Sequence, residues 1–238
     1  MIDPPSPGLT STLFDLNLCA PADLKRCRRL VKRLAYDVPA FDSIWLDALL
    51  QARKLTRFQA QILESAQADR LSVGPCVLVD QLGHGVQSTT YLARRREGSE
   101  QVVLKLMDRP LESLEADLEQ LSELASRLRR LSHSSAVGPH TALRHGDRLV
   151  AISRHVPGPH VGELMVRRGR FAPDVVSSIG RQLLEGLAAL EALDCIHGDI
   201  RLNNVRLTAS GHAVLVDAGV RPAITPELTI LSRVQPDR

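Results

Sequence analysis

The sequence predicts an α+β protein: a small all-α module, then a five-stranded antiparallel sheet with one helix, then a mainly helical segment. Residues 21–70 carry apolar side chains at helical spacing. Residues 76–156 contain five strand-type runs, the first three separated by short turns that contain glycine. Short turns join antiparallel strands, whereas parallel strands need long crossovers. Because helices and strands occupy separate stretches of the chain, the α+β class is favoured.

The composition is that of an ordinary soluble globular chain. The 238 residues are 44% hydrophobic and 24% charged, which suits one large domain or two small ones. The formal net charge of +3 requires neither a nucleic-acid partner nor a membrane surface, and no run of 18 apolar residues predicts a membrane span. The four cysteines are scattered without metal-type spacing. We therefore expect a cytoplasmic protein with no nucleic-acid partner.

The first 70 residues divide into an arm and a helical module. Residues 1–20 contain three prolines with glycine, serine and threonine, and predict a disordered arm. From Pro21 an apolar stripe at helical spacing is surrounded by lysines and arginines. Such a basic helix can bind a membrane or nucleic acid, although a solvated face is the commoner explanation. Further helices are expected over 41–53 and 56–66.

The remaining elements follow from a change of period at Cys76. The predicted strands are residues 76–83, 89–96, 101–107, 141–145 and 148–156. The predicted helices are residues 111–131, a helix that begins near His160, and residues 172–193. Two more β-type runs lie between Asn204 and Asp217.

A glycine-containing turn joins the first two strands. Gly83 and Gly85 are followed by Ser88 in the run GHGVQS. Glycine lets the backbone approach phosphate oxygens closely and point its N–H groups at them. Alone, this pattern is explained equally well by an ordinary hairpin turn.

A single lysine lies in the third strand. Lys105 follows Gly83 by 22 residues, within the apolar run 102–107, and only four of the 30 basic residues are lysines. Burying an ammonium group costs free energy unless the group is paired. A compact point charge suits a phosphate, whereas a strand lysine can also extend its head group into solvent. The glycine turn upstream favours the phosphate-binding interpretation.

Acids and amides cluster after the last long helix. Asp199 and Asn204 lie in one loop, and Asp217 follows the apolar run 213–216. Carboxylate and amide oxygens at the ends of short strands suit a hard divalent cation. Relative to Asp199, Arg201 stands at +2, Asn204 at +5 and Asp217 at +18.

This spacing resembles the catalytic loop and metal-binding aspartate of protein kinases. With the glycine turn and Lys105 upstream, the chain resembles the bacterial, eukaryotic-like serine/threonine protein kinases over residues 76–238. The resemblance implies a kinase N-lobe at 76–156 and a partial C-lobe at 157–238. Two departures stand out: Ser88 replaces the third glycine, and Ala218 replaces the phenylalanine after the metal-binding aspartate.

The resemblance implies a catalytic role for three residues. Asp199 would accept or orient the proton of the incoming hydroxyl, and Arg201 would stabilise the transferred phosphoryl group where the family usually has lysine. Lys105 would bind the ATP phosphates. Asn204 and Asp217 would hold Mg²⁺, so ATP and magnesium are the expected cofactors.

The resemblance also implies a nucleotide-binding set. Gly83, Gly85 and Ser88 would cover the phosphates, and Val103 lies in the strand that carries Lys105. The implied hinge would consist of the gatekeeper Ser153 and the backbone groups of Arg154 and Val156. A plain strand-to-turn junction explains the same residues equally well. Glu123 would orient Lys105 from the next helix, although the register points to Leu124 instead.

The implied reaction is ATP- and Mg-dependent transfer of the γ-phosphoryl group to a protein serine or threonine. Gly198 stands where most regulated kinases have arginine, which indicates a non-RD type. We therefore expect that phosphorylation of Thr225, Thr229 or Ser232 is not the activating switch.

Two other functions fit the same residues. The departures at Ser88 and Ala218 suit a pseudokinase, or an ATP-binding regulatory or scaffolding module. The sequence His-Gly-Asp at 197–199 also occurs in aminoglycoside phosphotransferases, so a small-molecule substrate is an alternative to a protein.

Only about 20 residues follow Gly219, without an Ala-Pro-Glu motif, and we expect a piece of a longer protein.

Overall fold

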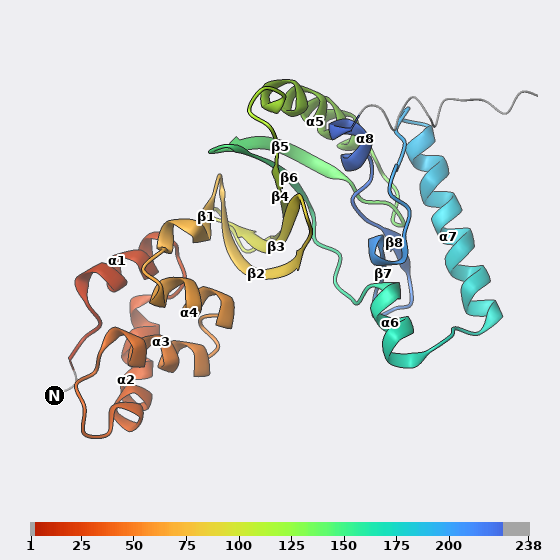
Figure 1. Ribbon diagram of the computed structural model, residues 1–238. Helices are drawn as coiled ribbons and strands as arrows, with labels where there is room; N and C mark the ends of the chain where they lie inside the picture. The colour runs from red at the N-terminus through yellow and green to blue at the C-terminus, as the bar shows by residue number, and fades with distance from the viewer. Residues whose placement is uncertain (1–2, 226–238) are drawn as a thin grey trace, which may run out of the picture. The chain divides into compact units, whose positions relative to one another are not determined.

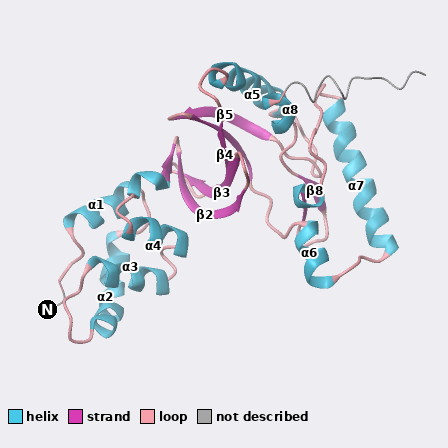
Figure 2. Cartoon of the chain, viewed as in Figure 1, coloured by secondary structure: helices cyan, strands magenta, loops and turns pink. Residues whose placement is uncertain are grey.

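The computed structural model describes residues 3–225, and its backbone contacts divide into two compact units (Figure 1). The first unit holds Met1–Gly85 and Thr89–Gln101, and the second holds Val86–Ser88 and Val102–Arg238. Helices and antiparallel strands occur in both units (Figure 2). The predicted mixed fold is confirmed, and each of the five predicted strands is present.

Helices make up the N-terminal part of the first unit. They are α1 (Pro7–Asp15), α2 (Pro21–Ala35), α3 (Asp42–Gln51), α4 (Arg57–Glu64) and a 3₁₀ turn (Ala68–Leu71). The apolar stripe of α2 is buried, with Val31 fully covered, while its lysines and arginines are exposed. The amphipathic pattern therefore predicted this helix and its buried face correctly.

The disordered arm expected over residues 1–20 is wrong for its central part, where α1 forms. Ser6 caps this helix by accepting a hydrogen bond from Leu9 N at 3.1 Å, and Pro7 occupies the first helical position, where its missing N–H costs nothing. Leu13 is fully buried. Ser6 also donates to Asp42, 36 residues away, at 2.5 Å. A tertiary partner thus fixes a helix whose proline content suggested disorder.

The strands of the first unit form an antiparallel series. They are β1 (Ser72–Val73), β2 (Cys76–His84) and β3 (Ser88–Arg95). Thr56, the N-cap of α4, donates to Val79 O at 2.6 Å, and Gln59 donates to Leu78 O at 2.8 Å. Helix α4 therefore docks on β2 within this unit. The domain boundary expected between residues 70 and 76 stays a prediction.

The second unit contains a three-stranded antiparallel series in the order β4–β6–β5. Its elements are β4 (Gln101–Asp108), α5 (Leu114–Leu128), β5 (Pro139–His145) and β6 (Arg148–Arg154). In the β4–β6 pair, Lys105 stands opposite Ala151 and Val103 opposite Ser153. Helix α5 lies against β5 and β6 and buries Leu121 and Leu124.

The remainder of the second unit holds the loop that carries the acids. Its elements are α6 (Val161–Arg168), α7 (Pro173–Glu191), a 3₁₀ turn (Leu202–Asn204), β7 (Val205–Leu207), β8 (Ala213–Leu215) and α8 (Val220–Ile224). Strands β7 and β8 form an antiparallel hairpin, as the two β-type runs predicted. Helix α8 carried no signal in the sequence, and it packs against α5.

Among the described residues, none of the helices has the length and apolar character needed to cross a membrane.

Candidate active site

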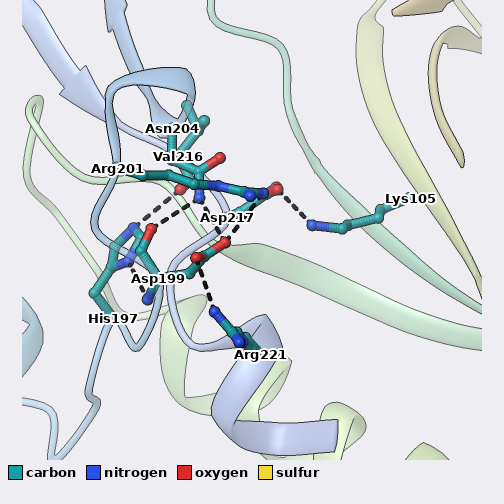
Figure 3. A network of polar contacts seen from close by, with 8 residues as sticks. All are labelled: Lys105, His197, Asp199, Arg201, Asn204, Val216, Asp217 and Arg221. Atoms are coloured by element: carbon teal, nitrogen blue, oxygen red, sulfur yellow. Dashed lines mark hydrogen bonds and ion pairs between the residues drawn. The ribbon is translucent and has the colours of Figure 1, made fainter. Parts of the chain in front are cut away.

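Strand β4 holds Lys105 beside the acid that the sequence placed 112 residues away. Lys105 Nζ donates to Asp217 Oδ2 at 2.7 Å (Figure 3). The two side chains are 16% and 19% exposed, and the strand neighbours Leu104 and Leu106 are buried. The ammonium group is therefore paired in a partly desolvated place rather than extended into solvent, which strengthens its Coulomb attraction to the carboxylate.

The backbone around Asp217 is fixed by hydrogen bonds on both sides. Asp217 adopts φ +64° and Gly219 φ +74°, both in the left-handed region. Val216 N donates to Asn204 O at 2.8 Å, and Gly219 N donates to His197 O at 3.0 Å. These bonds tie the segment that carries Asp217 to the loop that carries Asp199.

Ala218 stands where the family has phenylalanine, and its surroundings explain the small side chain. It is fully buried in a cluster with Leu124 and Leu128 of α5. A Cβ added at Gly138 would lie 2.9 Å from Ala218 O and 3.4 Å from Ala218 Cβ. A side chain at position 138 would therefore meet Ala218, so glycine is the residue that fits opposite it.

Asp199 is held by one amide and two arginines. Asn204 Nδ2 donates to Asp199 O at 2.8 Å and to Asp199 Oδ2 at 2.9 Å, and Asn204 is only 4% exposed. Arg201 approaches Asp199 Oδ2 at 3.2 Å, and Arg221 of α8 approaches Oδ1 at 3.3 Å. Both arginine side chains are more than half exposed, so each ion pair contributes little stability. Asn204 is therefore the main positioning contact.

His197 connects the two acidic segments in its neutral form. Its Nδ1 accepts from Asp199 N at 3.2 Å, and its Nε2 lies 2.9 Å from Val216 O. A backbone N–H can only donate and a carbonyl can only accept, so the ring proton is on Nε2. Burial lowers the pKa of His197 below its ordinary value, in agreement with a neutral ring.

This lowered pKa predicts acid sensitivity of the loop that carries Asp199. Protonation favours the unfolded state, because unfolded His197 binds a proton at a higher pH than folded His197. The contribution of neutral His197 to the free energy of unfolding is therefore fully present above its unfolded pKa of about 6.5. This contribution falls as the pH drops toward the lower pKa of folded His197. His155 and His160 contribute in the same direction, since burial lowers the pKa of each.

We expect His197→Gln to weaken the loop at pH 7.5 and to flatten the loss of stability between pH 7 and pH 5. Losing one buried hydrogen bond costs about 1–3 kcal/mol. Urea unfolding at a series of pH values measures both effects. A variant with the same pH slope as the unmodified chain would contradict this assignment.

Gly198 is required by the local backbone. It adopts φ +75°, and a Cβ there would lie 2.0 Å from Pro222 Cγ in α8. Proline rings cannot move aside as a flexible side chain can, so this packing excludes the arginine that most regulated kinases carry. Thr225 directly follows α8, whereas Thr229 and Ser232 lie outside the described residues. The expectation that these sites are not activating stays a prediction.

The expected pairing of Glu123 with Lys105 is not found among the described residues. Glu123 is exposed, and the ion pair of Lys105 is with Asp217. Leu124 is 4% exposed, and its Cδ1 would lie 2.7 Å from a Cβ at Gly219. The inward position of α5 is therefore residue 124, as the register indicated, and it carries no charge.

Arg206, which the sequence did not single out, contacts the predicted hinge segment. Its Nη1 donates to Gly158 O at 2.6 Å and lies 3.4 Å from Val156 O. Val156 itself is buried, Ser153 is 7% exposed and Arg154 is exposed. An arginine in a short strand offers no sequence signal for this contact, because its partners lie about 50 residues earlier.

The glycine turn follows strand β2, which carries Gly83. Gly83 stands opposite Thr90 in the β2–β3 pair, and His84 Nδ1 lies 2.9 Å from Thr89 Oγ1. A Cβ added at Gly83 would meet nothing within 4 Å, so the backbone there is accessible. Gly85 belongs to the first unit, whereas Ser88 belongs to the second.

The side chains of Asp217 and Asn204 can supply some, but not all, of the oxygen ligands that a hard cation needs. Among the described residues, no group of three or more His, Cys, Asp or Glu side chains could hold a metal alone. Asp217 uses Oδ2 for Lys105, and Asn204 uses Nδ2 for Asp199. One oxygen of each side chain is left for a cation whose other ligands are phosphate and water, as is usual for Mg²⁺.

The sequence of the chain is similar to those of several serine/threonine protein kinases. The chain is 28% identical over 154 residues to the mitogen-activated protein kinase kinase kinase ANP1 of Arabidopsis thaliana, which covers 63% of this chain and 23% of that protein. It is 27% identical over 158 residues to the serine/threonine-protein kinase ATG1a of the same plant, covering 65% and 25%. It is 27% identical over 168 residues to the serine/threonine-protein kinase PkaA of Streptomyces coelicolor, covering 64% and 31%.

The chain thus spans less than a third of the length of each of these relatives. They support the expected enzyme class, a serine/threonine protein-kinase-like phosphotransferase. Residues 76–234 match the family model of the protein kinase domain, which is more than half of the chain. The chain therefore belongs to the protein kinase family.

Proposed function

We propose that this chain transfers the γ-phosphoryl group of ATP to a serine or threonine hydroxyl of a protein, in a magnesium-dependent reaction. The observation that carries the proposal is the 2.7 Å contact between Lys105 and Asp217. This contact places the ammonium group of Lys105 beside the carboxylate of Asp217. The other carboxylate, that of Asp199, lies 2.9 Å from Asn204 Nδ2. Phosphoryl transfer depends on positioning and on charge stabilisation, and these groups supply both.

Lys105, Asp217 and Asn204 would bind the phosphates and the cation. Lys105 would donate to phosphate oxygens, for which its Nζ has hydrogens beyond the one given to Asp217. The free oxygens of Asp217 and Asn204 would hold Mg²⁺. The bound cation would neutralise charge on the phosphates.

Asp199 would orient the attacking hydroxyl and accept its proton. Asn204 holds the Asp199 carboxylate at 2.9 Å, which restricts its rotation. Arg201, with its head group 3.2 Å from Asp199, would stabilise charge on the transferred group. Because Gly198 stands where most regulated kinases have arginine, an activating phosphate would have no arginine to bind there. The reaction would therefore not depend on such a phosphate.

The nucleotide would be bound by the remaining predicted residues. Gly83, Gly85 and Ser88 would cover its phosphates, and Val103 with the facing Ser153 would border the base. Backbone groups of Arg154 and Val156 would contact the adenine. Pairing of Lys105 with Glu123 would require α5 to rotate about its axis, because Leu124 occupies the inward position.

A nucleotide-binding pseudokinase is the second candidate, and one observation favours it. Lys105 pairs with Asp217 rather than with a glutamate, and Arg221 covers one oxygen of Asp199. For transfer, Arg221 would have to leave Asp199 Oδ1, and Lys105 would have to bind phosphate without a glutamate partner. A small-molecule kinase shares every residue of the proposal and differs only in the acceptor.

The test uses the full chain with radiolabelled ATP, with and without magnesium. We expect ATP with Mg²⁺ to raise Tm and label to pass to casein, while Lys105→Ala loses both responses. Lys32→Ala, on the exposed face of α2, is the matched control. Stabilisation by ATP without transfer to any acceptor would establish the pseudokinase. Transfer to an aminoglycoside but not to casein would establish the small-molecule kinase.

Arg221→Ala is expected to raise the transfer rate modestly. Arg221 lies 3.3 Å from Asp199 Oδ1 and competes there with an incoming hydroxyl. An exposed ion pair is worth at most about 1 kcal/mol, which corresponds to roughly a fivefold change in rate. Steady-state kinetics beside Arg130→Ala, an exposed arginine away from the site, measure the effect. A tenfold decrease would mean that Arg221 supports catalysis instead.

A further inference from the structure

The first unit contains a cavity of about 600 Å³ that the kinase residues do not explain. Its walls come from the end of α3, the link to α4, and strands β2 and β3, all within that unit. Its apolar lining is Leu18, Leu50, Leu55 and Val79. This volume falls within the range of about 300–1,000 Å³ that is typical of small-molecule sites.

The charged lining of the cavity is entirely positive. Arg53, Lys54 and Arg94 line it, and no aspartate or glutamate does. Lys54 is paired with Asp23 at 2.8 Å, and Asp23 does not line the cavity. Arg53 has no ion pair or hydrogen bond from its side chain to another described residue. The cavity therefore carries an excess of positive charge that an anion would neutralise.

Arg94 adds to this excess without a carboxylate of its own. Its Nη2 donates to Leu16 O at 2.7 Å and to Asn17 O, both just after α1. Burial lowers the pKa of the Arg94 guanidinium, and the nearby Arg96 lowers it further. Neutral carbonyls satisfy the hydrogen bonds of this cation, but they do not cancel its charge.

The cavity borders the contact between the helical module and the kinase strands. Thr56 and Gln59 line it, and they donate to Val79 O and Leu78 O of β2. The register of β2 shifts between Leu78 and Asp80, so these two carbonyls lie at a bulge. Strand β2 then continues to Gly83. A ligand here would touch the residues that couple α4 to the strand leading into the glycine turn.

We propose that this cavity binds a small organic anion, with a carboxylate or phosphate head group and a short apolar body. Arg53 and Lys54 bind the head group, while Leu18, Leu50 and Leu55 cover the apolar part. Binding stabilises the contact of α4 with β2, and thereby gives the helical module a regulatory role. This role is independent of whether the chain transfers phosphate.

The test titrates octanoate and hexyl phosphate into the full chain by calorimetry at low ionic strength. Octanol, octylamine and inorganic phosphate test the charge and the apolar body separately. We expect one site for at least one of the two anions, with the tighter one identifying the head group. Affinity should fall at least fivefold at 0.5 M salt, because a partly open site is screened. Octanol, octylamine and inorganic phosphate should bind at least tenfold more weakly.

Arg53→Glu should weaken binding at least tenfold, since it reverses a lining charge that has no structural partner. Arg57→Glu is the matched control, because Arg57 is exposed nearby on α4 but does not line the cavity. Ser99→Trp, in an exposed turn at the cavity wall, blocks the space without removing a charge and should also abolish binding. Absence of binding at 5 mM, equal affinities for octylamine and octanoate, or equal effects of the two arginine changes would overturn the proposal.

Discussion

Asp199→Asn should lower the rate of phosphoryl transfer by about 10²–10⁴-fold while leaving ATP affinity within about threefold. General-base catalysis by a positioned side chain is worth this range, and an amide cannot accept the proton. The substituted side chain keeps an oxygen that can accept from Asn204 Nδ2, so the loop geometry is retained. Single-turnover transfer and ATP titration measure the two quantities separately.

Asp194→Asn is the matched control for this experiment. Asp194 is exposed five residues earlier, and its φ of +53° suits asparagine at least as well as aspartate. Its transfer rate should equal that of the unmodified chain. If Asp199→Asn also retained more than a tenth of that rate, Asp199 would not be the group that accepts or orients the proton.

Gly158→Ala is expected to cause a large loss of stability, because two costs add at this position. Gly158 adopts φ +126°, and a Cβ there would lie 2.0 Å from Leu207 O. Strained backbone of this kind costs about 1–3 kcal/mol for a residue other than glycine. Forcing β7 away from its packed position costs about 1–3 kcal/mol more.

Gly98→Ala separates the two costs. Gly98 has the same φ of +126°, but a Cβ there would meet nothing within 4 Å. Urea unfolding followed by circular dichroism should therefore place Gly158→Ala about 1–3 kcal/mol below Gly98→Ala. Hydrogen exchange should show faster opening of β7 in the first variant alone. Equal losses in the two variants would mean that close packing on Leu207 adds nothing.

Local pattern was sufficient for most elements of the fold. The change from helical to strand period at Cys76 correctly predicted β2 to β6, because short apolar runs bounded by turn residues favour strands. The helix expected over residues 56–66 is present as α4, which begins at Arg57 with Thr56 as its N-cap and Gln59 completing the capping box. Helix α1 was missed, since the cap at Ser6 depends partly on Asp42, and periodicity cannot show a partner 36 residues away.

In the candidate site, too, the sequence pointed to the residues but not to the partners of those residues. Residue type and a spacing that resembles the protein-kinase motifs led to Lys105, Asp199, Asn204 and Asp217, and the roles of these residues stay predictions. The partner of each group was a different matter. Lys105 pairs with Asp217 across 112 residues, and Leu124 rather than Glu123 faces inward on α5.

The sequence by itself predicted the protein kinase family, most of the helices and strands, and a candidate set of reactive groups. Only the tertiary structure decided which charges meet: Lys105 with Asp217, and Arg221 with Asp199. It also showed that Gly198 is required by the ring of Pro222. The physical reason is that periodicity reports which side of an element is buried. The choice of ion-pair partner depends on how elements far apart in the chain pack together.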